Sequence, residues 1–319
     1  MKKFILFAFA AAMLLSGACQ KVNDTNEGDF VDVTLSVDIP YGIATKSIGD
    51  GTTATELYYG VFSQDGEYIQ SLAQTAALPV DGKTATLKLK LVRNYTYTIV
   101  FWAQSPEASY YTFNAETGVV TVDYTGKAND ENRDAFCGVY TFDVPDAATF
   151  KGTVTLKRPF AQINFGADDF APITELGLPM KSTIAVEGLA NVYDILNGSI
   201  SGSVETKFDS NTVPAQFSQA DTLEVGGKKY GYVSMNYILA PVNEYDKEGK
   251  VIVAHKELAN VRATFSYNEK DVIVDVPNVP YQRNFRTNIV GTLFTSDVEL
   301  TITVDPAFYQ PDIEHDLVK

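Results

Sequence analysis

Nine residues near the N-terminus alternate between apolar and polar side chains without a break. The apolar members are Val31, Val33, Leu35, Val37 and Ile39, and the polar members are Asp32, Thr34, Ser36 and Asp38. A period of two predicts a β-strand with one face in a core and the other in water. Pro40 ends this strand, and residues 298–305 repeat the same alternation near the C-terminus.

Short strands separated by turn residues fill the rest of the chain. Asp65-Gly66, Asp81-Gly82 and Gly226-Gly227 are hairpin turn signals. The 18 Tyr and 19 Phe residues favour strands, and no window of helical length keeps a 3.6-residue period. A chain of 319 residues is long enough for two domains. We therefore predict two antiparallel β-sandwiches, over residues 31–150 and over residues 151–319, the second with a short polar tail.

The first 30 residues read as an export signal followed by a tether. Lys2 and Lys3 precede an apolar run that is shorter than the roughly 20 residues of a spanning helix. The run closes on Leu14-Leu15-Ser16-Gly17-Ala18-Cys19, which resembles the lipobox of bacterial lipoproteins. We predict a signal peptide over residues 1–18, lipidation of Cys19 and a flexible acidic tether over residues 19–30. The alternative is a plain signal peptide cut beside Ala18, which leaves Cys19 as a thiol.

The charge balance argues against a nucleic-acid partner. The chain has 40 acidic and 25 basic residues, with a formal net charge of -15. Binding a phosphate backbone requires a basic patch or stripe, whereas the Lys and Arg residues here are scattered among carboxylates. The acidic surface is better explained by solubility and self-repulsion at a cell exterior.

Residue types that carry catalysis are scarce. The chain has two histidines, His255 beside Lys256 and His315 in the tail, and both are expected on the solvated surface. Residues 198–202 place their serines wrongly for a nucleophile elbow. With Cys19 lipidated, Cys137 is the one remaining thiol, and we expect it to be a small buried strand residue. We therefore predict no catalytic residues, no enzyme activity and no cofactor.

Two further groups of residues offer weaker candidate ligand sites, for calcium and for a sugar. Asn129, Asp130, Glu131 and Asp134, like the stretch Asn23 to Asp29, offer oxygen ligands for calcium, but a solvated loop fits both better. Tyr58-Tyr59, Tyr110-Tyr111 and Trp102 offer a sugar-stacking platform, although core packing is the simpler explanation. We predict no metal site.

Two longer stretches carry a resemblance to a known family. Residues 157–166 read KRPFAQINFG, and residues 282–291 read QRNFRTNIVG. Together with the lipobox and the alternating first strand, they resemble the fimbrillins of Bacteroidota, the lipoprotein-derived subunits of type V pili. The resemblance covers essentially the whole chain. It implies two tandem Greek-key-type sandwiches of the transthyretin-like kind and a lipid-anchored position on the outer membrane or in a fimbrium.

The resemblance also implies an assembly mechanism. A trypsin-like protease cuts after the first strand, the strand is lost, and a strand from another fimbrial subunit fills the groove by β-strand addition. In this sequence the removable strand is Val31 to Ile39 and the cut falls between Lys46 and Ser47, where fimbrillins usually have arginine. The candidate donor strand carries Val298, Leu300, Ile302 and Val304. The sequence leaves open whether the protein is a stalk, tip or anchor subunit. It also leaves open which host or bacterial surface ligand, if any, the protein binds.

A second interpretation belongs to another functional class. In it the protein is a surface lipoprotein that binds glycans through one face of a sandwich and never polymerises. The sequence supports either, because both require export, lipidation and the same β-sandwich architecture.

Overall fold

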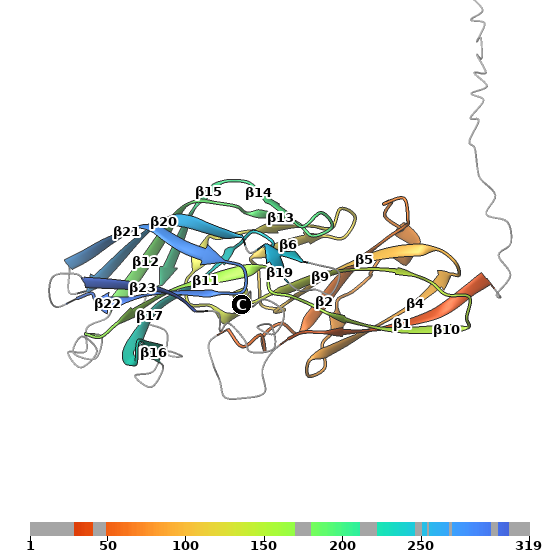
Figure 1. Ribbon diagram of the computed structural model, residues 1–319, viewed down its shortest axis with the longest axis horizontal. Helices are drawn as coiled ribbons and strands as arrows, with labels where there is room; N and C mark the ends of the chain where they lie inside the picture. The colour runs from red at the N-terminus through yellow and green to blue at the C-terminus, as the bar shows by residue number, and fades with distance from the viewer. Residues whose placement is uncertain are drawn as a thin grey trace, which may run out of the picture.

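The structure is a computed structural model, which describes residues 29–40, 49–169, 180–210, 222–245, 251–253, 255–267, 270–294 and 299–305. In these ranges the regular elements are strands, apart from two single-turn 3-10 helices, η2 (Gln70–Leu72) and η3 (Glu131–Arg133). Figure 1 shows an elongated molecule with β1, β4 and β10 towards one end and β20 to β23 towards the other.

The N-terminal sandwich consists of a three-stranded and a four-stranded sheet. The first has the order β10-β1-β4 and the second the order β3-β2-β5-β9. Their bounds are β1 (Phe30–Asp38), β2 (Glu56–Phe62), β3 (Leu78–Pro79), β4 (Thr84–Val92), β5 (Thr96–Gln104), β9 (Phe136–Asp143) and β10 (Thr149–Thr155). Leu35, Val61 and Phe101 lie fully buried in the core between the sheets. In β4 the lysines Lys88 and Lys90 alternate outward, which leaves the apolar face for this core.

The C-terminal sandwich pairs two five-stranded sheets. Their orders are β16-β17-β11-β22-β23 and β21-β20-β12-β15-β8. The first sheet comprises β11 (Phe160–Ala167), β16 (Thr222–Val225), β17 (Lys228–Leu239), β22 (Arg286–Thr292) and β23 (Glu299–Asp305). The second comprises β8 (Gly126–Lys127), β12 (Met180–Leu189), β15 (Val204–Ser210), β20 (Lys256–Tyr267) and β21 (Lys270–Gln282). Between the sheets the rings of Phe165 and Phe265 meet edge to face at 5.9 Å.

A smaller sheet joins the two sandwiches. It has the order β14-β13-β7-β6, with β6 (Tyr111–Asn114), β7 (Val119–Val122), β13 (Val192–Asp194) and β14 (Ser199–Ser201), and a short pair is formed by β18 (Glu244–Tyr245) and β19 (Val251–Val253). The second core extends into this region and reaches β5. Phe101 of β5 points into the N-terminal core, whereas Trp102 points into the C-terminal one. The uninterrupted apolar run in β5 is thereby explained, because both of its faces are buried.

The all-β sandwich fold is confirmed, but the strands are not all antiparallel. β1 pairs in parallel with β10, β11 with β22, and β15 with β8. A parallel partner is reached only through a long connection, so it leaves no local pattern in the sequence. The two sandwiches are therefore mixed rather than purely antiparallel as predicted.

The position of the domain boundary also differs from the prediction. A boundary between residues 150 and 151 falls inside β10, all of whose residues pair with β1 of the first sandwich. Val154 and Leu156 belong to the N-terminal core, and the chain enters the second sandwich only at Phe160. Residues 153–157 therefore belong with the first sandwich rather than opening the second.

The glycine Gly60 provides a test of the packing between β2 and the joining sheet. A Cβ at Gly60 would lie 2.2 Å from the carbonyl oxygen of Ala115, whereas a Cβ at Gly138 would meet only the side-chain tip of Leu156, at 2.9 Å. Backbone cannot move aside as a side chain can. We expect Gly60→Ala to lower the free energy of unfolding by about 3 kcal/mol or more and Gly138→Ala by about 1 kcal/mol. Urea denaturation of the two variants measures this, and equal losses would contradict the packing described.

Candidate functional site

The strand β1 occupies the middle of its sheet. It pairs in parallel with β10 from Asp32↔Thr149 to Asp38↔Thr155, and antiparallel with β4 from Phe30↔Val92 to Asp38↔Thr84. The pairing continues past the strand, where the Ile39 N–H donates to the Lys83 carbonyl at 2.8 Å. β4 and β10 are each bonded to β1 and not to one another. Removal of β1 would therefore open a slot with an unpaired backbone edge on both sides.

The inward face of β1 is entirely buried. Its apolar side chains are 0 to 1% exposed: Val31, Val33, Leu35, Val37 and Ile39. Burial of each such side chain contributes roughly 1.5 to 3 kcal/mol. The slot would thus be apolar at its floor as well as open in its backbone, which is the geometry that accepts a strand of alternating pattern.

Gly49, the first described residue after the segment that follows β1, is held by the junction of the sandwiches. The predicted cleavage pair, Lys46 and Ser47, lies outside the described residues, as do the signal peptide and Cys19. At Gly49 the backbone N–H donates to Glu131 Oε2 at 2.8 Å, and the carbonyl accepts from Arg158 Nη2 at 3.0 Å. Thr53 Oγ1 adds a hydrogen bond to the Glu131 carbonyl at 2.9 Å. The predicted cut therefore lies between two anchored segments, β1 and Gly49.

Arg158 is the centre of a buried ion-pair network at the junction of the sandwiches. It binds Asp134 in a bidentate manner, with Nε to Oδ1 at 2.6 Å and Nη2 to Oδ2 at 2.8 Å, and both side chains are 0% exposed. Arg158 Nη1 donates to Asn284 Oδ1 at 3.0 Å. One guanidinium therefore bridges a loop beside the first sandwich, the start of the second, and the turn before β22.

The two stretches that carried the family resemblance lie side by side. Residues 157–166 contain β11 and residues 282–291 contain most of β22, and these strands pair in parallel. The Arg283 Nε donates to the Arg158 carbonyl at 3.0 Å, and Asn164 Nδ2 donates to Asn288 Oδ1 at 2.9 Å. Buried hydrogen bonds thus join polar residues of the two stretches to one another.

The acidic loop at residues 129–134 is not a solvated loop, contrary to the interpretation from sequence. Asn129 is 3% exposed and Asp134 0%. Asp130 caps η3 through the Asn132 N–H at 3.0 Å and accepts from the Tyr110 hydroxyl. In the described part of the chain no group of three or more His, Cys, Asp or Glu is placed to hold a metal ion. Of the second candidate calcium stretch, only Asp29 lies within the described residues.

The carboxyl of Glu131 in this loop has a strongly perturbed acidity. Burial raises its pKa to about 7, and the neighbouring carboxylates of Asp134 and Asp50 act in the same direction. The hydrogen bond from Gly49 and the charge of Arg286 oppose the rise. The group that holds Gly49 in place therefore titrates near neutral pH.

The aromatic residues considered for sugar stacking pack internally instead. Trp102 is 0% exposed, and its ring meets Tyr111 at 5.2 Å. The Arg133 guanidinium lies 3.6 Å from the centroid of the Tyr110 ring, which occupies that face. Tyr59 is 8% exposed, and Tyr58 packs partly buried against the core. No open aromatic platform forms from these residues.

Other residues singled out from the sequence have structural roles. Cys137 lies in β9 with 2% exposure, so the prediction of a buried strand residue is confirmed. His255 is half-buried before β20 rather than fully solvated, and Ser199 and Ser201 lie exposed in β14. His315 lies outside the described residues. In the described part of the chain we find no helix whose length and apolar character would let it cross a bilayer.

The candidate donor segment is the edge strand of its own sandwich. Leu300, Ile302 and Val304 lie in β23 and pair with Gly291, Ile289 and Thr287 of β22. Val298 lies outside the described residues. Ile302 is 38% exposed, so an apolar residue faces solvent on this strand.

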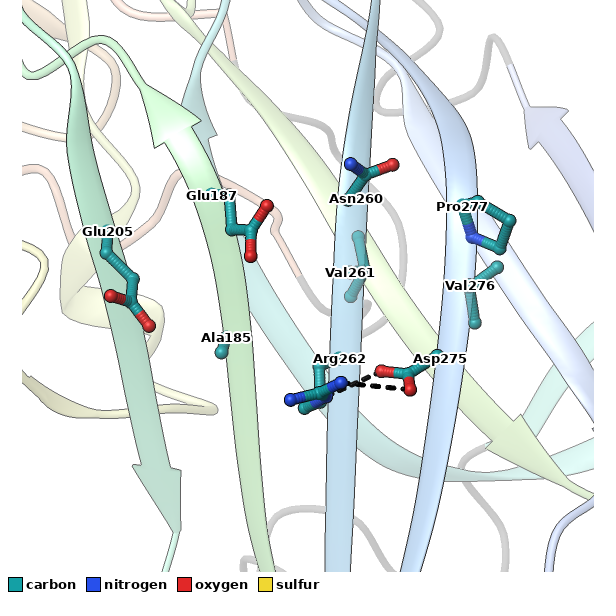
Figure 2. A pocket seen from close by; sticks show the side chains of 9 residues that line it. All are labelled: Ala185, Glu187, Glu205, Asn260, Val261, Arg262, Asp275, Val276 and Pro277. Atoms are coloured by element: carbon teal, nitrogen blue, oxygen red, sulfur yellow. Dashed lines mark hydrogen bonds and ion pairs between the residues drawn. The ribbon is translucent and has the colours of Figure 1, made fainter.

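A shallow pocket lies on the outer face of the second sandwich, where β15, β12, β20 and β21 run side by side. Figure 2 shows Glu205, Glu187, Arg262 and Asp275 around it, with Arg262 and Asp275 joined. The register of β12 against β15 shifts beyond Val186, and that of β20 against β21 shifts after Ala259, so the sheet is irregular at this level. Its lining holds three carboxylates and one guanidinium, which makes it acidic.

Comparison with known proteins identifies a family and a fold. A family model described as a family of unknown function (DUF6562) matches residues 25–317. Among proteins with curated descriptions, none matches the chain in sequence.

Solved structures show the same architecture at low sequence identity. A candidate polysaccharide-binding protein (DUF1812) from Bacteroides thetaiotaomicron is 9% identical with a TM-score of 0.50, over 86% of this chain and 96% of its own. A candidate adhesin from Bacteroides ovatus is 12% identical with a TM-score of 0.50, over 86% and 93%. The tip fimbrial protein Mfa3 from Porphyromonas gingivalis, solved with a C-terminal truncation, is 12% identical with a TM-score of 0.43, over 86% and 99%. The first two likenesses establish a common fold.

Two Arg–Asp pairs of matching geometry allow the junction to be tested. Arg262 also binds Asp275 in a bidentate manner, at 2.6 and 3.1 Å, but the side chains of Arg262 and Asp275 are 64% and 60% exposed. Asp134→Asn leaves the buried Arg158 charge without its counter-ion, and we expect a loss of about 3 to 5 kcal/mol in the free energy of unfolding. Asp275→Asn should cause no measurable loss. Urea denaturation compares them, and similar losses would show that burial does not govern the Arg158 pair.

The raised pKa of Glu131 predicts a pH-dependent stability with a definite sign. In the unfolded chain the carboxyl ionises near its ordinary pKa of 4.5, and in the folded chain only near 7. The folded state therefore loses stability as pH rises from 4.5 through 7. Glu131→Gln keeps an acceptor for the Gly49 N–H and removes the titration. We expect the free energy of unfolding of the variant to rise by up to about 3 kcal/mol relative to that of the wild type between pH 5 and pH 8. The free energy of unfolding of both proteins is measured across this pH range. The same change with pH in both proteins would refute the assignment.

Proposed function

The chain belongs to DUF6562, a family of unknown function, and we propose that it is a fimbrial subunit of the cell surface that assembles by replacement of β1. The observation that carries the proposal is the position of β1, which lies between β4 and β10 as the middle strand of its sheet and whose inward face is buried. Because β1 is the first strand of the chain, a single cut after it would separate it from every later strand. The remaining chain would keep all the other strands of the N-terminal sandwich.

The N-terminal sequence supports a surface location. Residues 1–18 direct export, and lipidation of Cys19 anchors the precursor to the outer membrane, since stable anchoring takes two hydrophobic signals and a diacylated or triacylated cysteine supplies them. Cys19 is joined to β1 through the short tether of residues 19–30. One cut between Lys46 and Ser47 would therefore remove the anchor and the groove-filling strand together. Release and readiness for assembly become a single event.

The slot selects its occupant by physical chemistry. It offers backbone partners on both edges and an apolar floor shaped for five alternating side chains, so an incoming strand must alternate in the same way. The segment with Val298, Leu300, Ile302 and Val304 has that pattern. To donate, β23 must leave β22, to which it pairs over seven residues. Another fimbrial subunit with a free alternating segment meets the requirement without that step.

A glycan-binding surface lipoprotein is the second candidate function. The pocket in Figure 2 supports it, because its lining combines carboxylate, amide and guanidinium groups with apolar residues such as Ala185 and Pro277, and sugars bind such mixed surfaces. In this alternative β1 stays in place and the chain remains monomeric. Neither candidate requires enzyme activity, and we propose none.

Limited proteolysis tests the proposal directly. Mild trypsin treatment of the mature protein should yield one stable product beginning at Ser47, because strands protect most other basic residues, and Lys46→Ala should prevent that cut. N-terminal sequencing and mass spectrometry identify the product. First cleavage within either sandwich would contradict the proposed processing site.

Assembly separates the two candidate functions. Incubated after the cut, the wild-type chain should form ladders that resist boiling in detergent, since an inserted strand is held by both edges of the slot. The uncut Lys46→Ala chain serves as the matched control and should stay monomeric. A cut chain that loses residues before Ser47 and yet forms no ladders would favour the glycan-binding alternative.

A further inference from the structure

The outward face of the N-terminal sheet carries the side chains that would border the slot left by β1. The outward residues of β1 are Asp32, Thr34, Ser36 and Asp38. The residues that flank them in register are Lys90, Lys88, Thr86 and Thr84 of β4 and Thr149, Lys151, Thr153 and Thr155 of β10. Each of these flanking residues is a lysine or a threonine, so the border of the slot is hydroxylic and cationic.

The register places the lysines beside particular residues of β1. Thr34 lies between Lys88 of β4 and Lys151 of β10, and Asp32 lies beside Lys90. The three lysines are exposed, as is Asp32. Opposite charges on neighbouring strands attract, and like charges repel. The position of Thr34 is therefore the most cationic in the outward row, because a lysine flanks it on either side.

The acidic part of this face belongs to β1 itself. The charged residues of β1 are Asp32 and Asp38, and Asp38 Oδ1 accepts from Thr84 Oγ1 at 2.8 Å. Both carboxylates would leave with β1, whereas the lysines of β4 and β10 would remain. The empty slot would then be cationic at its border, in a chain whose formal net charge is -15. A local charge of that sign makes the slot selective for charge as well as for alternation.

Three segments of the chain share the alternation that the floor of the slot requires but differ in their outward charge. Residues 31–38 read VDVTLSVD and residues 298–305 read VELTITVD, each with an acidic residue at both ends of the outward row and hydroxyls between them. Residues 85–91, within β4, read ATLKLKL and carry lysines at two of these positions. Alternation alone does not separate the three, because burial of apolar side chains is non-directional. The charged border of the slot does.

We propose that Lys88, Lys90 and Lys151 select the strand that enters the slot, by admitting an alternating strand with acidic or hydroxyl side chains outward and rejecting one with basic side chains outward. The inference rests on the proposed replacement of β1. It gives that function a partner class, a strand of another subunit with carboxylates on its outward face. Rejection matters as much as attraction, because the lysine-bearing β4 of a second copy also alternates and would otherwise compete for the slot.

Opposite charges placed at residue 34 test the selectivity in the intact mature chain, without any cut. A hollow of about 310 Å³ lies over Thr34 and Ser36 and is lined also by Lys151, so a longer side chain has room there. We expect the equilibrium constant for unfolding to be about tenfold smaller for Thr34→Glu than for Thr34→Lys, because the flanking lysines attract the one and repel the other. Urea denaturation in low salt measures both constants, and added salt should narrow the difference. Equal constants would overturn the proposal.

The neighbouring outward position provides the matched control. Ser36 is flanked in register by Thr86 and Thr153, which carry no charge. Ser36→Glu and Ser36→Lys should therefore differ by less than about threefold in the same measurement. A preference for Glu as large at residue 36 as at residue 34 would contradict the role given to the lysines.

Reversal of the border charges separates electrostatics from side-chain size. In a chain that carries both Lys88→Glu and Lys151→Glu, the preference at residue 34 should reverse, so that Thr34→Lys becomes the more stable variant. A role of the lysines in packing alone would not produce that reversal. An unchanged preference for Thr34→Glu in this background would contradict the proposal.

Peptides test entry into the slot itself. The chain cut between Lys46 and Ser47 is offered fluorescent peptides of residues 29–40 that carry either Thr34→Glu or Thr34→Lys. We expect the Glu peptide to replace the β1 fragment at about a tenfold lower concentration, as fluorescence anisotropy measures. Equal entry of both peptides contradicts charge selection but not the replacement of β1. Entry of neither peptide, with the preference at residue 34 intact in the uncut chain, contradicts the replacement of β1 and supports the charge preference of the sheet alone.

Discussion

The pairing of β1 on both of its edges is the constraint on which the N-terminal sandwich depends. A middle strand satisfies two neighbours at once, so its nine residues complete the backbone hydrogen bonds of β4 and β10 as well as the core beneath them. A strand at the edge of a sheet could leave at little cost. A middle strand leaves a slot that is costly to keep empty, and this difference makes β1 suitable for exchange rather than simple loss.

The ion pair of Arg158 and Asp134 supplies the complementary property that the proposed exchange requires, a junction whose contacts do not depend on β1. Taking both charges out of water is costly unless the geometry of the pair is excellent. The bidentate contact between Arg158 and Asp134, together with the hydrogen bond from Arg158 to Asn284, meets that condition. Gly49 is bonded to the same network through Glu131 and Arg158. The chain beyond the proposed cut is therefore fixed to the junction independently of β1, so the sandwiches would remain joined after processing.

Sequence patterns predicted strands better than their partners. The alternation from Val31 to Ile39 fixed both the extent and the buried face of β1, and Asp81-Gly82 marked a true turn before β4. The parallel pairing of β1 with β10 was missed because more than a hundred residues separate the strands and no local signal links them.

Asp134 looked solvated for the same reason, since its partner Arg158 lies 24 residues away. Arg158 and Arg283 have no recognisable role in the sequence, and only their shared position in the fold reveals that they hold the junction. The boundary beside residue 150 failed because β10 belongs to the sheet of a strand at the opposite end of the domain's sequence.

Hydrogen exchange of the processed chain tests the replacement of β1 most directly. After the cut between Lys46 and Ser47 and removal of the β1 fragment, the backbone amides of β4 and β10 that pair with β1 should lose protection, while those of β11 and β22 keep theirs. Adding an assembly-competent subunit should restore protection in β4 and β10 alone. Protection that is unchanged by removal of the fragment, or that is lost equally in both sandwiches, would contradict the account.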